Sequence, residues 1–262
     1  MEGVAHPVLG LALGLLVGFV LGLLGGGGSI LALPIFLYVF LVPTKPAIAM
    51  SLVVVGMSAF VGFLSHWRQG TVNLRVAVPF GLCAMVGAFA TARLAHYVPE
   101  QAQLALFGAF AIAASVMMLR DSLRPLAPLP TEGRAATGGH FTWPLALQAL
   151  GVGVLTSLIG AGGGFVIVPA LVLLAHVPVK PAVGSSLLII TMNSLSGFAG
   201  YIGQVPIQWG LVGAFTGVAA VGALTGTRLV PHVPQARIKQ GFAVMILLLG
   251  AYFALRKLHV VP

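Results

Sequence analysis

Two runs of consecutive small residues have the most distinctive spacing in this 262-residue sequence. Residues 25–29 read Gly-Gly-Gly-Gly-Ser, and residues 160–164 read Gly-Ala-Gly-Gly-Gly. Each glycine weakens a helix by about 1 kcal/mol relative to alanine, so both runs interrupt the helices around them. A helix that restarts after such a break presents free amides and a positive dipole end, which favour an anion. We therefore predict a substrate-binding role for Gly25, Gly26, Gly27, Gly28, Ser29, Gly160, Ala161, Gly162, Gly163 and Gly164.

Close packing of helices is the alternative interpretation of these two runs. Small residues allow helix backbones to approach each other within a membrane. Packing alone does not require consecutive glycines, which favours the anion interpretation. The sequence leaves both interpretations open.

Polar side chains in the apolar segment after each break form a second set of candidates. Hydroxyl and amide groups can donate hydrogen bonds to an oxyanion without the cost of burying an unpaired charge. The candidates pair at matching positions, Ser51 with Ser186 and Ser58 with Asn193. Hydrogen bonding between helices is the alternative role, and it has equal weight for Ser58.

Two lysines mark the turns that lead into these segments. Lys45 and Lys180 each lie within a Pro-x-Lys-Pro sequence. We expect each lysine to line a vestibule and to attract anions towards the site. Anchoring to lipid headgroups is the other reading of both residues.

The positions of the acidic residues limit the chemistry further. All four lie outside the apolar segments or at their ends: Glu2, Glu100, Asp121 and Glu132. Cation sites and carboxylate proton relays within a membrane normally need an acidic residue. The sequence also lacks a Ser-His-Asp or Cys-His arrangement and a closely spaced metal-binding pair. We therefore predict no metal, no cofactor and no enzymatic activity.

The composition places the candidate residues in a lipid bilayer. Hydrophobic residues make up 59% of the chain and charged residues 6%, whereas charged residues make up roughly 25% of soluble domains. The 13 basic residues exceed the 4 acidic ones, but they lie at the ends of apolar runs. There they orient a membrane protein and contact anionic headgroups rather than nucleic acid.

The chain is a tandem duplication with an offset of 135 residues and no gap. The segment Val-Pro-Thr-Lys-Pro-Ala at 42–47 matches Val-Pro-Val-Lys-Pro-Ala at 177–182. Shared apolar composition alone would not keep Gly, Pro, Lys, Arg and Gln in phase. We therefore assign residues 1–120 to a first membrane repeat, 121–142 to a linker and 143–262 to a second membrane repeat.

Each repeat contains four apolar segments. They span residues 7–42, 46–66, 74–95 and 100–120 in the first repeat, and 143–177, 181–203, 207–229 and 234–255 in the second. The last three of each repeat have the length of about 20 residues that a membrane-spanning helix needs. The first of each is about 35 residues long and is broken by the glycine run, so it must bend or fold back. The predicted fold is all-α and polytopic, with a glycine-broken helical hairpin and three transmembrane helices in each half.

The distribution of basic residues distinguishes two topologies. If each broken segment is a tilted single span, the 13 basic residues divide six to seven between the two sides. If each is a re-entrant hairpin, they divide nine to four. The larger bias favours hairpins and inverted repeats, with a cytoplasmic linker and both termini on the external side.

At these residues the chain resembles the TauE/SafE sulfite exporter family. The resemblance rests on the two glycine runs, each followed by Pro34 or Pro169, on the Pro-x-Lys-Pro-Ala motifs and on His-Trp-Arg-Gln-Gly at 66–70. It covers nearly the whole chain. It departs from the family pattern at Val205-Pro206, where the usual Gly-polar turn is absent.

The resemblance implies transport of small sulfur-containing anions such as sulfite, sulfonates or sulfoacetate across a bacterial inner membrane. We expect a multi-pass secondary transporter or exporter that exposes a midplane anion site alternately to the two sides. An anion channel on the same scaffold is the alternative. The expected partners are the anion and the lipid bilayer. The sequence leaves open the direction of transport, the coupling ion and the oligomeric state, for which a homodimer is one option.

Overall fold

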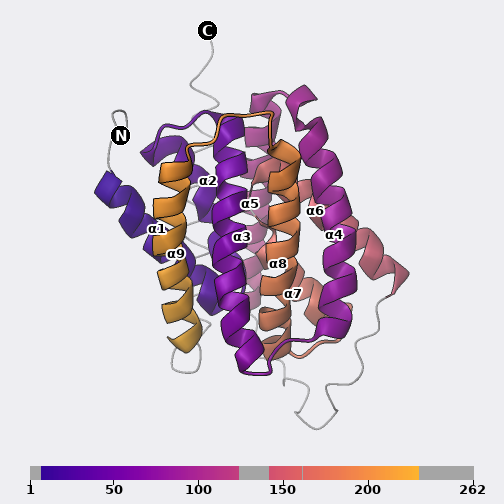
Figure 1. Cartoon of the computed structure of the whole chain (residues 1–262). Helices are drawn as coiled ribbons and strands as arrows, with labels where there is room; N and C mark the ends of the chain where they lie inside the picture. Colours follow the sequence, from indigo (N-terminus) through magenta and orange to yellow (C-terminus); the bar gives the residue numbers. More distant parts are fainter. Residues whose placement is uncertain (1–6, 124–141, 161, 230–262) are drawn as a thin grey trace.

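A computed structural model describes residues 7–123, 142–160 and 162–229 of the chain, and the segment 234–255 therefore lies outside the described residues. The described part is helical and contains no strand (Figure 1). The predicted all-α fold of a polytopic membrane protein is confirmed. In chain order, the elements are α1 (Pro7–Leu24), η1 (Gly27–Leu31), α2 (Ala32–Pro34), η2 (Ile35–Val39), α3 (Thr44–Arg68), α4 (Leu74–Leu94), η3 (Ala95–Tyr97), α5 (Glu100–Leu123), α6 (Trp143–Ile159), α7 (Gly164–Leu173), α8 (Val179–Tyr201) and α9 (Trp209–Leu229).

Four helical stretches of the described chain are long and apolar enough to cross a membrane. They are Thr44–Arg68, Leu74–Tyr97, Pro181–Tyr201 and Trp209–Leu229. Exposed tryptophans lie at helix ends, with Trp67 near the end of α3, Trp143 at the start of α6 and Trp209 at the start of α9. Aromatic residues are enriched at membrane interfaces, so these positions fit helices that end near the headgroups.

The first broken segment folds back on itself. Gly10, near the start of α1, faces the ring of Phe40, which follows η2. Gly28, within the glycine run, packs against the backbone of Val17 and Leu21 in α1. The outer ends of the two arms therefore lie together, and the chain turns at the glycine run, as expected for a hairpin.

The returning arms of the two hairpins end in the same way. Leu41 and His176, which are separated by the repeat offset, both adopt a positive φ, of 54° and 53°. A Val-Pro pair follows each of them and leads into α3 or α8. A left-handed conformation is strained for non-glycine residues, so its recurrence indicates that both hairpins are closed by the same turn.

Helices α3 and α8, which are repeat equivalents, pack against each other in antiparallel fashion. Glycines on one helix face leucines on the other in opposite numerical order: Gly62 faces Leu187, Gly56 faces Leu195, and Gly197 faces Leu52. The crossing is therefore centred near residues 57 and 192, which are themselves related by the repeat offset. A two-fold arrangement of the two helices follows from these contacts.

The hairpins pack against the opposite half of the chain. Helix α1 lies along α9, and α6 lies along α4, while α3 and α8 lie between these pairs (Figure 1). The most extensive helix contacts among the described residues all join the first half to the second: α1 with α9, α4 with α8, α4 with α6, α3 with α8, and α3 with α9. Each half therefore relies on the other to bury its helices.

Glycines permit the closest of these contacts. A Cβ atom at Gly18 of α1 would overlap the carbonyl oxygen of Ala219 in α9. Its equivalent, Gly153 of α6, meets the carbonyl oxygen of Ala84 in α4 in the same way. Backbones this close cannot accept a methyl group unless the helices separate.

We predict that Gly153→Ala destabilises the protein by about 1–3 kcal/mol, because its methyl group would force α6 away from α4. Gly151, on the same helix, has open space around its Cβ position, so Gly151→Ala is the matched control and should be neutral or slightly stabilising. Thermal unfolding of the two detergent-purified variants checks this. Equal melting temperatures would contradict the proposed packing.

Candidate functional site

The two glycine runs meet inside the molecule. A Cβ atom built on Gly26 would overlap the Cα atom of Gly164, and one built on Gly164 would overlap the Cα atom of Gly26. Gly162 lies beside Ser29, with 3.3 Å between its Cβ position and the serine Cβ. The structure thus brings together Gly26 with Gly164 and Ser29 with Gly162, which are 138 and 133 residues apart in the sequence, as an anion site shared by the two halves requires. We call residues 25–29 the first tip and residues 160–164 the second tip.

The backbone of the tips depends on glycine. Gly25 and its equivalent Gly160 have φ values of 67° and 69°. Gly26, Gly162 and Gly163 also have positive φ values, of 146°, 62° and 70°. These conformations cost other residues stability, and Gly26 lies where essentially only glycine is found. The consecutive glycines therefore shape the tips as well as allowing them to touch.

One hydrogen bond holds each tip to the opposite half, and the two bonds cross. The Ser51 hydroxyl of α3 lies 2.9 Å from the carbonyl oxygen of Gly160. The Ser186 hydroxyl of α8 lies 2.5 Å from the carbonyl oxygen of Gly25. The donors and the acceptors are both repeat equivalents, so the same bond is made twice in opposite directions. We call these two bonds the serine latches.

In the serine latches, the hydroxyl groups donate to carbonyl oxygens of the chain, whereas the sequence suggested that they donate to an anion. Ser51 also lies 2.8 Å from the Ile48 carbonyl oxygen, and Ser186 lies 2.8 Å from the Val183 carbonyl oxygen. A hydroxyl has one hydrogen to donate, and here two carbonyl oxygens share it. In this conformation the two serines bind the tips, and their hydrogens are not available to an anion.

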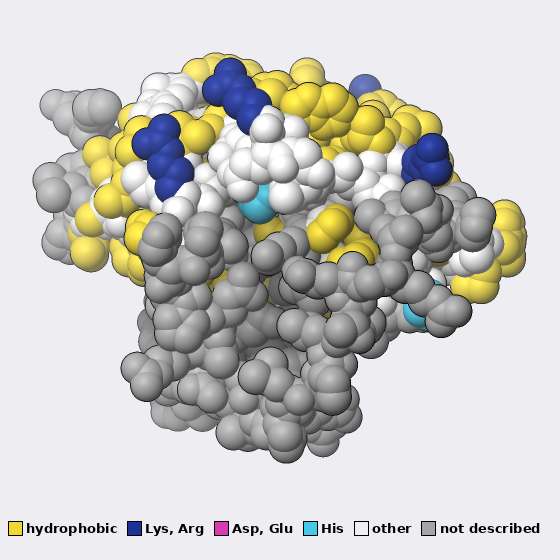
Figure 2. All heavy atoms as spheres, turned by 90° about the horizontal axis from the view of Figure 1, so that it is seen from below, with side chains coloured by type: hydrophobic (Ala, Val, Ile, Leu, Met, Phe, Trp, Pro, Cys, Tyr) yellow, Lys and Arg dark blue, Asp and Glu magenta, His cyan; other side chains and the backbone are white. Residues whose placement is uncertain are grey.

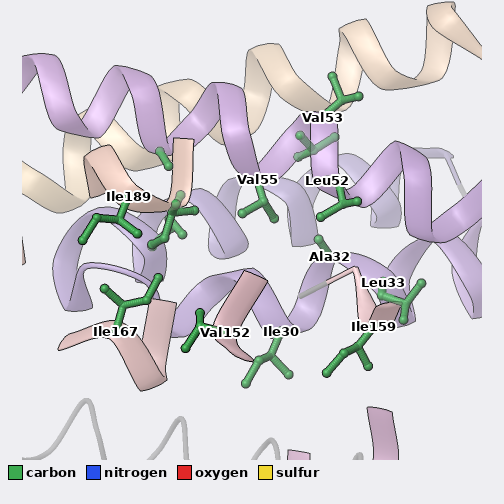
Figure 3. Packing of buried hydrophobic residues seen from close by; sticks show 14 of the residues in the cluster. Ile30, Ala32, Leu33, Leu52, Val53, Val55, Val152, Ile159, Ile167 and Ile189 are labelled. Atoms are coloured by element: carbon green, nitrogen blue, oxygen red, sulfur yellow. The ribbon is translucent and has the colours of Figure 1, made fainter. Parts of the chain in front are cut away.

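The walls beside the tips are apolar. Val55 of α3 and its equivalent Ile190 of α8 both approach Gly162, and Ile190 also contacts Gly164. Ile30, Val152 and Ile167 of the hairpin segments belong to the same buried hydrophobic cluster as Val55 (Figure 3). Apolar walls exclude water and strengthen any hydrogen bond made at the tips.

Ser29 closes the first tip on itself. Its hydroxyl donates to the carbonyl oxygen of Gly26 at 2.7 Å. Gly164 occupies the equivalent position in the second tip and cannot make this bond. Ala161 lies outside the described residues. The two tips therefore share a backbone shape but differ in their polar groups.

The second pair of polar candidates is buried, but its two members differ in their hydrogen bonds. Ser58 and Asn193 are each 1% exposed. The Asn193 amide nitrogen donates to the Thr156 hydroxyl of α6 at 2.5 Å. The Ser58 hydroxyl and the Asn193 carbonyl oxygen have no partner among the described residues. Sequence analysis missed Thr156, since its repeat equivalent is the apolar Leu21 and repeat matching alone cannot find it.

The two lysines lie at opposite ends of the molecule, because each belongs to the first turn of an antiparallel helix. Lys45 Nζ donates to the carbonyl oxygen of His96 at 3.0 Å, which ties the start of α3 to η3. The backbone of Lys180 begins α8, but its side chain lies outside the described part of the chain. Lys45 therefore has a defined structural contact in addition to its expected vestibule role.

Among the residues that the structure describes, no group of three or more His, Cys, Asp or Glu side chains is placed to hold a metal ion. The polar groups that converge near the tips are hydroxyls, one carboxamide and backbone amides. Such groups bind an anion through hydrogen bonds and need no net charge.

Comparisons with known proteins agree with this architecture. Residues 10–253 match the family model of the sulfite exporter TauE/SafE. A probable membrane transporter protein of Xylella fastidiosa is 34% identical over 244 residues, which cover 90% of each chain. Two such proteins of Bacillus subtilis, YdhB and YunE, are 24% and 26% identical over 231 and 261 residues, covering 86% and 93% of this chain and 90% and 95% of theirs. No solved structure matches this chain significantly.

We predict that Ser186→Ala destabilises the protein by about 1–3 kcal/mol, because the buried Gly25 carbonyl oxygen loses its donor. Ser51→Ala should behave in the same way, since it removes the equivalent bond to Gly160. Ser115→Ala is the control, because the buried Ser115 hydroxyl bonds, among the described residues, within its own helix to Ile112. Thermal unfolding checks the prediction, and Ser186→Ala melting together with Ser115→Ala would contradict it.

Proposed function

We propose that this chain, which belongs to the sulfite exporter TauE/SafE family and is a membrane transporter, moves a small sulfur-containing oxyanion of the sulfite, sulfonate or sulfoacetate type. The observation that carries this proposal is the meeting of the two glycine tips. Each tip is followed by a short helix whose first amides have no partner in their own helix. Two such amide sets on tips that touch each other would suit an oxyanion with several acceptor oxygens.

The proposed site is closed in this conformation. Gly26 and Gly164 touch directly, so an oxyanion can enter only when the tips move apart. The serine latches cross between the halves, and a rocking motion of one half against the other would therefore stretch them. We propose that substrate entry and breakage of a latch go together, first on one side of the membrane and then on the other.

We propose that the two repeats, 1–120 and 143–262, are inverted across the membrane and joined by the linker 121–142. The antiparallel crossing of α3 and α8 supports this arrangement, since equivalent helices then run in opposite directions. Alternating access requires a site that can open to either side of the membrane. Two inverted halves allow this, because exchanging their conformations turns an outward-open protein into an inward-open one.

The basic residues suggest which end is cytoplasmic. Helix α3 ends, α4 begins and α9 ends at the lower end of the molecule (Figure 1), and these termini carry Arg68, Arg75 and Arg228. Figure 2 shows Lys and Arg side chains spread over this lower face. The upper end carries Lys45 and Arg93. By the positive-inside rule we place the lower end in the cytoplasm of a bacterial cell and the protein in its inner membrane.

We propose that the protein acts as a transporter without enzymatic activity and that it needs no cofactor. Its partners are the transported anion and the lipid bilayer, and a homodimer is compatible with the exposed apolar helix faces. Neutral donors and helix ends would provide the affinity for the anion, and Lys45 and Lys180 would raise its local concentration at the two entrances.

Reconstitution tests this function directly. Protein in proteoliposomes should catalyse saturable flux of radiolabelled sulfite that unlabelled sulfite competes away. Empty liposomes provide the background. Absence of sulfite flux under every imposed ion gradient would exclude the proposed function. Conductance in planar bilayers, with flux too fast for alternating access, would favour the anion channel instead.

We predict that Gly162→Ala lowers the rate of sulfite flux at least about tenfold, because its methyl group would collide with Val55 of α3 and crowd Ser29 of the first tip. Gly70→Ala is the matched control. Gly70 has a φ of 67°, close to the 62° of Gly162, but has open space around it. Both substitutions place a side chain on a backbone with a similar positive φ, so the contact at the tip is the main difference between them. Equal flux in the two variants would show that the tip glycines serve folding alone.

A further inference from the structure

Only one end of the Asn193 carboxamide, near the second tip, has a hydrogen-bond partner among the described residues. Its nitrogen lies 2.5 Å from the Thr156 hydroxyl oxygen, while its oxygen is buried without a partner among the described residues. Asn193 follows Ile190 by one helical turn, and Ile190 contacts Gly162 and Gly164. The carboxamide therefore lies on the stripe of α8 that faces the tips, one turn beyond them.

Thr156 connects this carboxamide to the second tip. The threonine is 1% exposed, and its methyl group abuts the Cα of Gly163, where a Cβ atom would overlap it. Its hydroxyl donates to the Gly153 carbonyl oxygen at 3.2 Å and accepts from Asn193. One side chain thus touches the tip and sets the hydrogen bond of the asparagine.

The carboxamide has two orientations that fit the same space. In one, the nitrogen faces Thr156 and the oxygen is left unpaired, which is costly for a buried acceptor. In the other, the Thr156 hydroxyl gives up its 3.2 Å bond to the Gly153 carbonyl oxygen and donates to the Asn193 oxygen instead. The NH₂ group then takes the position of the unpaired oxygen, with two free hydrogens. The second orientation offers donors of the kind that an oxyanion needs.

We propose that Thr156 is a positioning residue that holds the Asn193 carboxamide with its NH₂ group towards the substrate, so that the sulfur oxyanion is bound mainly by the second half of the protein. This inference rests on the function proposed above. When the anion binds, it accepts hydrogen bonds from the Asn193 NH₂ group, which offsets the energy needed to rotate the carboxamide. The Thr156 hydroxyl then donates to the Asn193 oxygen on the other side.

The first half cannot supply an equivalent group. Its matching positions hold Ser58 and Leu21, and leucine has no atom that can hold a polar side chain in place. The two-fold arrangement of the helices therefore encloses a chemically asymmetric site. The anion lies closer to Asn193 than to Ser58.

Transport kinetics with sulfite as the probe test this inference. Thr156→Val keeps the shape of the side chain and removes its hydroxyl, whereas Thr156→Ser keeps the hydroxyl. Thr191→Val is the matched control, because within the described part of the chain the buried Thr191 hydroxyl bonds to Leu187 of its own helix. Asn193→Asp keeps the shape of the carboxamide and replaces its donors with a negative charge.

We expect Thr156→Val to raise the KM for sulfite about tenfold with little change in maximal rate, the effect of one lost hydrogen bond on affinity. Thr156→Ser should restore the KM, Thr191→Val should leave it unchanged, and Asn193→Asp should abolish saturable flux. A purely structural role for Thr156 would instead lower the melting temperature and leave the KM unchanged, which would overturn the inference.

The outcomes separate this inference from the function on which it rests. If the wild-type protein moves no sulfite, both fail. If it moves sulfite and Thr156→Val keeps the wild-type KM, the proposed function stands and the role of Thr156 is wrong. If Thr156→Val does not fold, Asn193→Asp alone decides, since wild-type kinetics in that variant would exclude the carboxamide as a donor to the anion.

Discussion

The two serine latches are the interaction on which the rest of the structure depends. Ser51 and Ser186 each reach across to a tip of the other half and satisfy a carbonyl oxygen that a glycine break has left without a helical partner. Within a membrane such an oxygen has no water to bind, so a break in a helix is tolerated only where protein supplies the missing group. The donor in each half therefore stabilises the break in the other, and neither tip is complete alone.

This mutual dependence accounts for the packing of each hairpin against the opposite half of the chain. The contacts of α1 with α9 and of α6 with α4 carry each hairpin to the far half of the chain, where the opposite serine can meet its tip. Glycines such as Gly18 and Gly153 make those contacts close enough. The same features make the site a shared one, so a movement of one half against the other acts on both tips together. Glycine in this chain thus serves packing and site geometry at once.

The sequence was sufficient to predict the coarse architecture. The repeat offset, the apolar segments and the glycine runs predicted an all-helical membrane protein with folded-back first segments, because each depends on local composition and spacing. The contacts that decide the chemistry depend on residues from different halves and could not be predicted in this way. Repeat matching pointed to Ser51 and Ser186 but not to their carbonyl acceptors, and it could not find Thr156, whose equivalent is apolar. Asymmetry between the halves is visible only when the partners are seen together.

The most direct test of the account is the position of the bound anion. Selenite is an oxyanion with the pyramidal shape of sulfite, and its selenium scatters anomalously, so an anomalous difference map from crystals grown with selenite locates the anion. The account predicts one anomalous peak between the two tips, with selenite oxygens about 3 Å from tip amides and nearer to Asn193 than to Ser58. A peak confined to the ends of the molecule near Lys45 or Lys180, with none at the tips, would contradict it.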